Sequence, residues 1–328
     1  MQVLMCVGLF LVGLVAIIKG ADWMTDGAAA VAKRYGISTM VIGMTIVAIG
    51  SSAPEFVVSA LAAFDGNTDM AIGNVVGSNI FNILVIMGAT AFVSPVVSSK
   101  GNIRYDLPFV ILSSLVILFA AFDSIFTPDA VNEISRSEGL LMLCLFAIYI
   151  SYTITIAKKS DNVQPASGAT QPEAKAAEVK PLWKCVLLVV VGLAMLLFGG
   201  DWLVDGASGI AIALGVSQSV VALTIVSMGT SAPELASSIM AARKGDTDMA
   251  LGNVVGSVIF NVFFVLGVAA VINPLALGNI SLMDIITLLL SSVLLWAFCK
   301  THSSLGRVEG LIMIIIQIIY YVLLIWQA

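Results

Sequence analysis

Apolar residues follow one another in long runs that are separated by short polar stretches. A transmembrane helix needs ~20 mostly apolar residues, and ten runs suited to this role cover most of the chain, at residues 3–30, 38–63, 70–94, 106–122, 138–157, 183–209, 217–242, 249–272, 281–299 and 308–326. The first run has no basic residue before it and no small-residue cleavage site before Lys19, so we expect it to stay as a helix. The pattern predicts an all-α integral membrane protein with ten transmembrane helices.

One long polar stretch interrupts this pattern. Residues 158–181 (KKSDNVQPASGATQPEAKAAEVKP) are rich in Pro, Ala, Lys and Glu and have too few apolar side chains to form a core. We therefore expect a linker at 158–181 that joins two membrane units, residues 1–157 and 182–328. Each unit contains five of the predicted helices.

The two units repeat each other. Residues 45–82 align without gaps on residues 224–261, and roughly two-thirds of the positions are identical. Because each unit has an odd number of helices, the second enters the membrane in the opposite orientation, which predicts inverted-topology repeats. Such repeats are typical of secondary transporters, which bind substrate near the membrane midplane. A duplicated bundle with a structural role is the alternative, but the identical positions are concentrated on polar residues, which lipid disfavours.

Basic residues predict the orientation, because cytoplasmic loops carry an excess of Lys and Arg. The loops after the odd-numbered predicted helices hold nearly all of them, namely Lys33, Arg34, Lys100, Arg104, Lys158, Lys159, Lys175, Lys180, Lys184, Arg243, Lys244, Lys300 and Arg307. The opposite side holds Arg136, and Lys19 lies inside the first run. We therefore expect the linker in the cytoplasm and both termini outside.

The composition agrees with a membrane protein and excludes several functions. Of the 328 residues, 59% are apolar and 11% are charged, against about 25% charged in soluble domains. A net charge of −5 leaves no basic surface for nucleic acid, which binds through clustered cations. The four cysteines show no CxxC spacing and His302 is the single histidine, so we expect no zinc site and no disulfide framework. We expect no cofactor.

The sequence does not predict an enzyme. It contains no GxxxxGK[ST] phosphate loop, which argues against an ATP-driven pump and favours an ion gradient as the energy source. His302 has no carboxylate beside it in a predicted loop, so an intramembrane hydrolase would lack a base.

Two glutamates lie deep within predicted helices. Glu55 and Glu234 occupy equivalent positions in the strings GSSAPE and GTSAPE. A carboxylate at the bilayer centre costs at least a few kcal/mol, so it persists where it lines a wet cavity or binds a cation. The preceding prolines, Pro54 and Pro233, each remove a helical amide and release carbonyls of the previous turn, which is tolerated only against a cavity or protein.

These short strings therefore supply the hard oxygen ligands that Ca²⁺ and Na⁺ prefer. The alternatives are an ordinary transmembrane kink at each proline, a serine hydroxyl bonded back to its own helix, and a protonated structural carboxyl at each glutamate.

A second pair of strings, GNVVGSNIFN and GNVVGSVIFN, places polar residues on the helix that follows each glutamate. Ser78 and Asn82 are four residues apart and share one helical face, and Ser257 and Asn261 repeat the arrangement. We expect this face to point inward. Hydrogen bonding between helices is the alternative role, and we favour it for the first asparagine of each string.

Together these strings resemble those of the cation/calcium exchanger superfamily, and within it the sodium/calcium exchangers. The paired motifs G[ST]SxPE and GNxxGSxxxN carry the resemblance, which covers essentially the whole membrane chain. It implies ten helices, alternating access, and exchange of several Na⁺ for one Ca²⁺ at a central cluster of sites.

The resemblance also implies the ligands. Glu55 and Glu234 would be the central acidic ligands, with Asn82 and Asn261 beside them. The flanking sodium sites would be completed by the hydroxyl groups of Ser51, Ser52, Ser78, Thr230, Ser231 and Ser257. The backbone carbonyls of Ala48 and Ser227 would also contribute.

This chain departs from the family pattern at two positions. Ser51 replaces a common threonine and so keeps the hydroxyl but loses a methyl. Asn261 stands where potassium-dependent exchangers, and some prokaryotic members, have an aspartate, so the site has two carboxylates rather than three and potassium co-transport is not expected. The GNxxE pattern of proton/calcium exchangers is not found in place of G[ST]SxPE, and the linker is too short for the calcium-sensing domain of animal exchangers.

We therefore expect an electrogenic Na⁺/Ca²⁺ antiporter of a prokaryotic cytoplasmic membrane. Its partners are then Ca²⁺, Na⁺ and the lipid bilayer, with no obligate protein partner. A Ca²⁺/H⁺ antiporter that uses the same glutamates is the first alternative, and manganese or another divalent cation stays open as cargo. A cation channel with a glutamate selectivity ring is the second, although two inverted halves favour alternating access.

Overall fold

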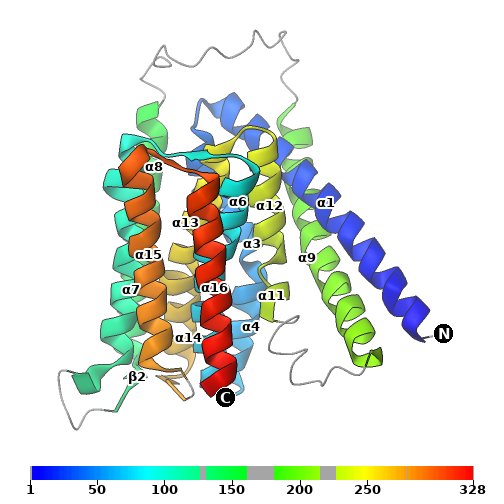
Figure 1. The fold of residues 1–328 in the computed structure, drawn as a ribbon. Coiled ribbons are helices and arrows are strands. Elements are labelled where there is room, and N and C mark those ends of the chain that lie inside the picture. The colour runs from blue at the N-terminus through cyan, green and yellow to red at the C-terminus, as the bar shows by residue number, and fades with distance from the viewer. Residues whose placement is uncertain (1, 126–130, 161–180, 215–226, 279, 328) are drawn as a thin grey trace.

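The computed structural model describes residues 2–125, 131–160, 181–214, 227–278 and 280–327, which form a bundle of long helices (Figure 1). The long helices are α1 (Gln2–Tyr35), α7 (Leu107–Ala121), α8 (Arg136–Ser160), α9 (Leu182–Ala213), α15 (Leu282–His302) and α16 (Arg307–Gln327). Shorter consecutive segments are α2 (Thr39–Ile42), η1 (Gly43–Val47), α3 (Ala48–Ser51), α4 (Ala53–Phe64), α5 (Thr68–Phe81), η2 (Asn82–Ile86), α6 (Met87–Val93), η3 (Asn102–Asp106) and η4 (Asp123–Ile125). Their counterparts in the second half are α11 (Ser227–Gly229), α12 (Ala232–Arg243), α13 (Thr247–Ile259), η6 (Phe260–Leu266) and α14 (Gly267–Ile272).

The structure is that of an all-α membrane protein. In the described ranges, eight helices are long and apolar enough to cross a membrane, and the bent pair Thr39–Ser51 and Ala53–Phe64 makes a ninth. The run predicted at 217–242 falls partly on residues 215–226, which lie outside the described residues, so the count of ten stays a prediction.

Helices border the predicted linker on both sides. Helix α8 continues through Ser160 because nothing in the Lys158–Lys159 pair breaks a helix. Helix α9 begins at Leu182, with Pro181 as its N-cap. The remainder of the predicted linker, residues 161–180, lies outside the described residues.

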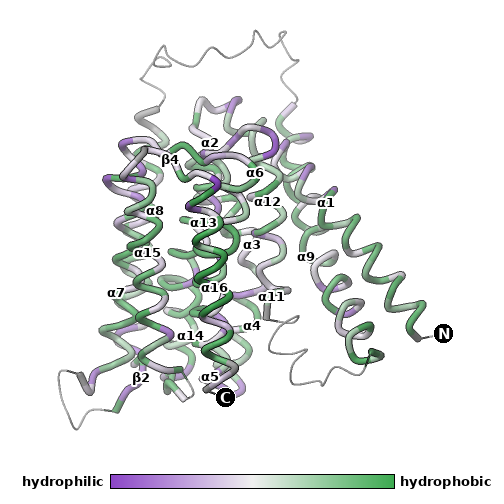
Figure 2. Tube along the Cα trace, in the orientation of Figure 1, coloured by the Kyte–Doolittle hydropathy of each residue, from purple (hydrophilic) through white to green (hydrophobic). Residues whose placement is uncertain are grey.

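The helices that contain the GNVVGS strings form the centre of the bundle. In Thr68–Val93 and Thr247–Ile272, 78% of the most apolar window is buried, compared with 17% for α1 and for Arg136–Ala157. Figure 2 shows that the peripheral helices α1, α9 and α16 are apolar along most of their length. Lipid accepts such exposed apolar surface, whereas water would not.

Helices α1 and α9 lie antiparallel, tilted against the rest of the bundle (Figure 1). A Cβ atom added to Gly13 would lie 2.7 Å from the carbonyl oxygen of Gly199, and one added to Gly20 would lie 2.7 Å from that of Gly192. The two backbones therefore touch at glycines spaced one heptad apart on each helix, a close approach that small residues permit. Figure 1 also places the start of α1 and the end of α16 at the same end of the molecule.

Short strands close the two ends of the bundle, which the apolar runs did not predict. Strand β1 (Val96–Val97) pairs antiparallel with β4 (Ser304–Leu305), and β2 (Glu133–Ile134) pairs antiparallel with β3 (Leu275–Ala276). In register, Val96 faces Leu305 and Glu133 faces Ala276. Each pair joins a loop of the first half to a loop of the second.

Candidate functional site

The two glutamates lie in the first turn of helices that follow a break. The chain bends by 48° between α3 and α4 at Ser52, and Glu55 follows Pro54 at the start of α4. In the second half, α11 ends at Gly229, and Glu234 follows Pro233 at the start of α12. Helix amides without an intrahelical partner favour negative charge at such positions. The break that the prolines predicted is therefore present in both halves.

Hydrogen bonds cross between the halves at these breaks. The hydroxyl of Ser52 donates to Oε1 of Glu234 at 2.7 Å, and that of Ser231 donates to Oε1 of Glu55 at 3.2 Å. Ser78 on α5 also donates to Oε1 of Glu55, at 3.3 Å. All five side chains are buried, with at most 4% exposed. Each carboxylate thus accepts a hydrogen bond from the serine at the helix break of the other half.

Several buried polar atoms of the predicted ligands have no hydrogen-bond partner within the described part of the chain. Each glutamate leaves one carboxylate oxygen without a partner, and the other atoms belong to amide and hydroxyl groups. The full set is Glu55 Oε2, Glu234 Oε2, Asn82 Oδ1 and Nδ2, Asn261 Oδ1, Ser257 Oγ and Thr230 Oγ1. A buried polar group without a partner costs about 1–3 kcal/mol, and native structures seldom leave so many. All but one of these atoms are oxygens, which suits a dehydrated hard cation.

The first asparagine of each GNVVGS string supports the glutamate rather than joining the unpartnered group. Asn74 donates to the backbone carbonyl of Glu55 at 3.1 Å and to Ser59 at 2.9 Å. Asn253 donates to the carbonyl of Glu234 at 3.3 Å and to Ser237 at 3.0 Å. The preference for hydrogen bonding between helices is confirmed at both positions.

Ser51 and Ala48, two further predicted ligands of the first half, also have partners. The hydroxyl of Ser51 lies 3.3 Å from Oδ1 of Asn253 and 3.3 Å from the carbonyl oxygen of Ala48. The same Ala48 carbonyl accepts the amide of Ser52 at 3.0 Å. The Ala48 carbonyl therefore already accepts two hydrogen bonds. Ser227 begins α11, and its side chain lies outside the described part.

The second asparagines lie in π-helical turns that the sequence analysis did not predict. Asn82 is the first residue of η2 and Asn261 the second residue of η6. Such turns shift the register of the helix and are frequent at functional sites. A third π segment, η1, leads directly into Ala48.

Sequence reasoning missed Asn79. Its amide contacts both Asn261 and the backbone of Val258 on the opposite half. The signal was present, because Asn79 and Val258 are equivalent positions and form the one polar-to-apolar difference between GNVVGSNIFN and GNVVGSVIFN.

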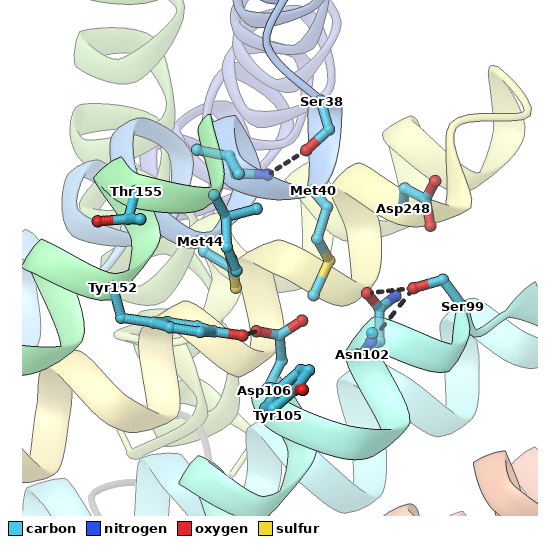
Figure 3. Close-up of a pocket in the computed structure, with 13 residues that line it drawn as sticks. Ser38, Met40, Met44, Ser99, Asn102, Tyr105, Asp106, Tyr152, Thr155 and Asp248 are labelled. Atoms are coloured by element: carbon cyan, nitrogen blue, oxygen red, sulfur yellow. Dashed lines mark hydrogen bonds between the residues drawn. The ribbon is translucent and has the colours of Figure 1, made fainter. Parts of the chain in front are cut away.

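A separate cavity of about 570 Å³ lies where α2, η3, α8 and α13 meet (Figure 3). Inside it, the hydroxyl of Tyr152 donates to Oδ1 of Asp106 at 3.0 Å. None of the predicted ligands lines this cavity. The described residues contain no group of three or more His, Cys, Asp or Glu side chains placed to hold a metal, so a cation at the two glutamates would need hydroxyl, amide or carbonyl oxygens as well.

Comparison with known proteins agrees with this arrangement. The family model for the sodium/calcium exchanger protein matches residues 5–155 and 184–326. The chain belongs to the sodium/calcium exchanger family. The family is one of transporters, and this chain is therefore a transmembrane cation/calcium antiporter of the prokaryotic type.

Relatives match this chain over nearly its full length. It is 40% identical to the candidate antiporter CaxA of Alkalimonas amylolytica over 96% of this chain and 97% of that protein. It is 29% identical to the sodium/calcium exchanger MaX1 of Methanosarcina acetivorans over 96% and 97%. Among solved structures, the sodium-calcium exchanger NCX_Mj soaked with 10 mM Na⁺ and zero Ca²⁺ matches with a TM-score of 0.80 and 32% identity, over 98% of this chain and 99% of that one.

Proposed function

We propose that the protein exchanges Na⁺ for Ca²⁺ by alternating access at a site between Glu55 and Glu234. The observation that carries this proposal is that both buried glutamates keep one carboxylate oxygen without a partner among the described residues. Uncompensated carboxylates inside a membrane protein are costly, and a cation offsets this cost. The relative MaX1 is named a sodium/calcium exchanger, which supports these two ions as cargo.

The proposed ligands fall into three chemical groups. The carboxylates of Glu55 and Glu234 balance the charge of one Ca²⁺, which avoids like-charge repulsion in a low-dielectric site. The amides of Asn82 and Asn261 and the hydroxyls of Ser78 and Ser257 extend the set with neutral oxygens. The flanking sodium positions use Ser51, Ser52, Thr230, Ser231 and the carbonyls of Ala48 and Ser227.

The proposed architecture is two inverted repeats of five helices, residues 1–157 and 182–328, joined by a cytoplasmic linker. The glycine contacts between antiparallel α1 and α9 support it, as do the equivalent breaks before α4 and α12. The bias of basic residues supports a cytoplasmic membrane location with both termini outside.

Purified protein in liposomes tests the proposal. We expect an outward Na⁺ gradient to drive uptake of ⁴⁵Ca, and a pH gradient without Na⁺ to drive none. Uptake driven by the pH gradient would instead support the Ca²⁺/H⁺ alternative, because the same carboxylates would then carry protons. Single-channel currents in planar bilayers would overturn alternating access. Competition of ⁴⁵Ca uptake by manganese and strontium measures the preference among divalent cations.

A further inference from the structure

The amides of Asn82 and Asn261 occupy equivalent positions but have different surroundings. Asn261 Nδ2 donates to Oδ1 of Asn79 at 3.0 Å, whereas neither amide atom of Asn82 has a partner in the described ranges. All three side chains are 0% exposed. This difference between Asn82 and Asn261 follows from a difference between the repeats. The position equivalent to Asn79 is Val258, whose side chain neither donates nor accepts a hydrogen bond.

The orientation of the Asn79 amide follows from a backbone group. Its second contact, at 3.2 Å, is with the carbonyl oxygen of Val258. A carbonyl oxygen accepts only, so the atom of Asn79 that faces it must be the NH₂ group. The amide oxygen of Asn79 then faces Asn261.

Because Asn79 presents an oxygen, Asn261 must present its NH₂ group to it. The oxygen of the Asn261 amide then points away from Asn79, and it is one of the buried oxygens without a partner. A backbone carbonyl of α13 therefore sets, through two side chains, which atom of Asn261 is free to meet a cation.

We propose that Asn79 is a positioning residue that holds the Asn261 amide with its oxygen toward the transported cation. This inference rests on the proposed function of the central site. Asn261 is then a preorganised neutral oxygen ligand, since its amide loses no rotational freedom when the cation binds. No described side chain fixes the Asn82 amide, so either its oxygen or its NH₂ group can face the cation. The two halves of the site therefore differ in how far their asparagine ligand is preorganised.

The experiment compares Asn79→Val, which copies the second repeat, in two backgrounds. In the first, Asn261 is unchanged and the variant frees its amide to rotate. In the second, Asn261→Asp, measured at about pH 9 so that its carboxyl is ionised, places two equivalent oxygens at this position, so orientation no longer matters. Ile80→Val, a buried neighbour on α5, controls for lost packing. Calorimetric Ca²⁺ titration of the full chain in detergent and the KM and maximal rate of Na⁺-driven ⁴⁵Ca uptake are measured for each.

We expect Asn79→Val to weaken Ca²⁺ binding and raise KM about five- to tenfold, the effect of one neutral hydrogen bond, with a smaller change in maximal rate. In the Asn261→Asp background the loss should shrink to less than about twofold. Equal affinity to wild type, or the same fold loss in both backgrounds, would overturn the positioning role. If Asn79→Val does not fold, Asn79→Ser replaces it, because serine is too short to reach both partners. Wild-type protein that binds no Ca²⁺ would overturn the proposed function instead.

Discussion

Ser52 in the first half of the chain donates a hydrogen bond to Glu234 in the second half, with 2.7 Å between Oγ and Oε1. The return bond, from Ser231 to Glu55, is longer at 3.2 Å. Because each carboxylate accepts a hydrogen bond from the helix break of the other half, a movement of either broken helix changes the surroundings of both carboxylates. Hydrogen bonds to charged groups contribute about 1.5–3 kcal/mol, which makes this pair of bonds a strong link between the halves.

The two serines are expected to differ in their effect on stability. Ser52→Ala leaves Oε1 of Glu234 buried without this donor and should lower the free energy of unfolding by about 1–3 kcal/mol. Ser231→Ala should cost less, because its bond is longer and Oε1 of Glu55 still accepts from Ser78. Thermal unfolding in detergent without Ca²⁺ measures both. Equal losses, or a larger loss for Ser231→Ala, would contradict this ranking.

Replacement of either central glutamate should abolish exchange without unfolding the protein. Glu55→Gln and Glu234→Gln keep the size of the side chain but remove the charge that compensates dehydration of Ca²⁺. Glu133→Gln, on strand β2 at one end of the bundle, serves as the matched control and should exchange normally. ⁴⁵Ca uptake and size-exclusion profiles are compared for the three variants. Near-normal uptake by either central variant would remove that glutamate from the ion site.

Asn261 should make exchange independent of potassium. Two carboxylates balance one Ca²⁺, whereas a third would have to bind a proton or another cation in a low-dielectric site. Between about pH 5 and pH 9, Asn261→Asp should therefore make exchange pH-dependent, with a rate near that of the wild type at acid pH, where the added carboxyl binds a proton, and a lower rate at alkaline pH, where it is ionised. Na⁺-driven Ca²⁺ uptake with and without K⁺ is measured for both proteins. A steep K⁺ requirement in the wild type, or superimposable pH profiles, would refute this account of the charge.

The contact between α1 and α9 should not tolerate a methyl group. A Cβ at Gly20 would lie 2.7 Å from the carbonyl oxygen of Gly192, and backbone atoms cannot step aside as a side chain can. Gly20→Ala should destabilise the protein by about 1–3 kcal/mol through overpacking. Gly8, on the same helix, has no described atom within 4 Å of its added Cβ, so Gly8→Ala should be neutral. Matched melting temperatures for the two variants would argue against close packing of these helices.

Cysteine labelling tests the predicted orientation. In a background without the four native cysteines, Asp65→Cys should react with a membrane-impermeant maleimide in intact cells, because the loop after the second predicted helix is predicted to lie outside. Lys100→Cys should react only after the membrane is opened. Both side chains are exposed, so access depends on the side of the membrane. The opposite labelling pattern would reverse the topology.

Much of the fold could be predicted because a bilayer permits few structures. A backbone in lipid must satisfy its own hydrogen bonds, so each apolar run of sufficient length forms a helix. The helix predicted at 70–94 runs from Thr68 to Val93, and the one at 281–299 runs from Leu282 to His302. The proline before each glutamate likewise located both breaks, since proline cannot donate to the preceding turn.

Asn79 shows what local pattern could not reach. Its helix was predicted, yet its role depends on the carbonyl of Val258 and the amide of Asn261, which belong to the other half of the chain. The π-helical turns at Asn82 and Asn261 were also not predicted, because their sequence is apolar and typical of an ordinary helix.

The sequence by itself determined the membrane class and the repeated halves, and it predicted the two glutamates as the chemical centre, because these follow from hydrophobic length, self-similarity and the cost of burying charge. The tertiary structure alone decided which serine holds which carboxylate and which atom of Asn261 is left free. Those relationships depend on how closely the helices of the two halves approach each other. Hydrogen bonds act over about 3 Å, a scale at which only the packed structure decides the partner.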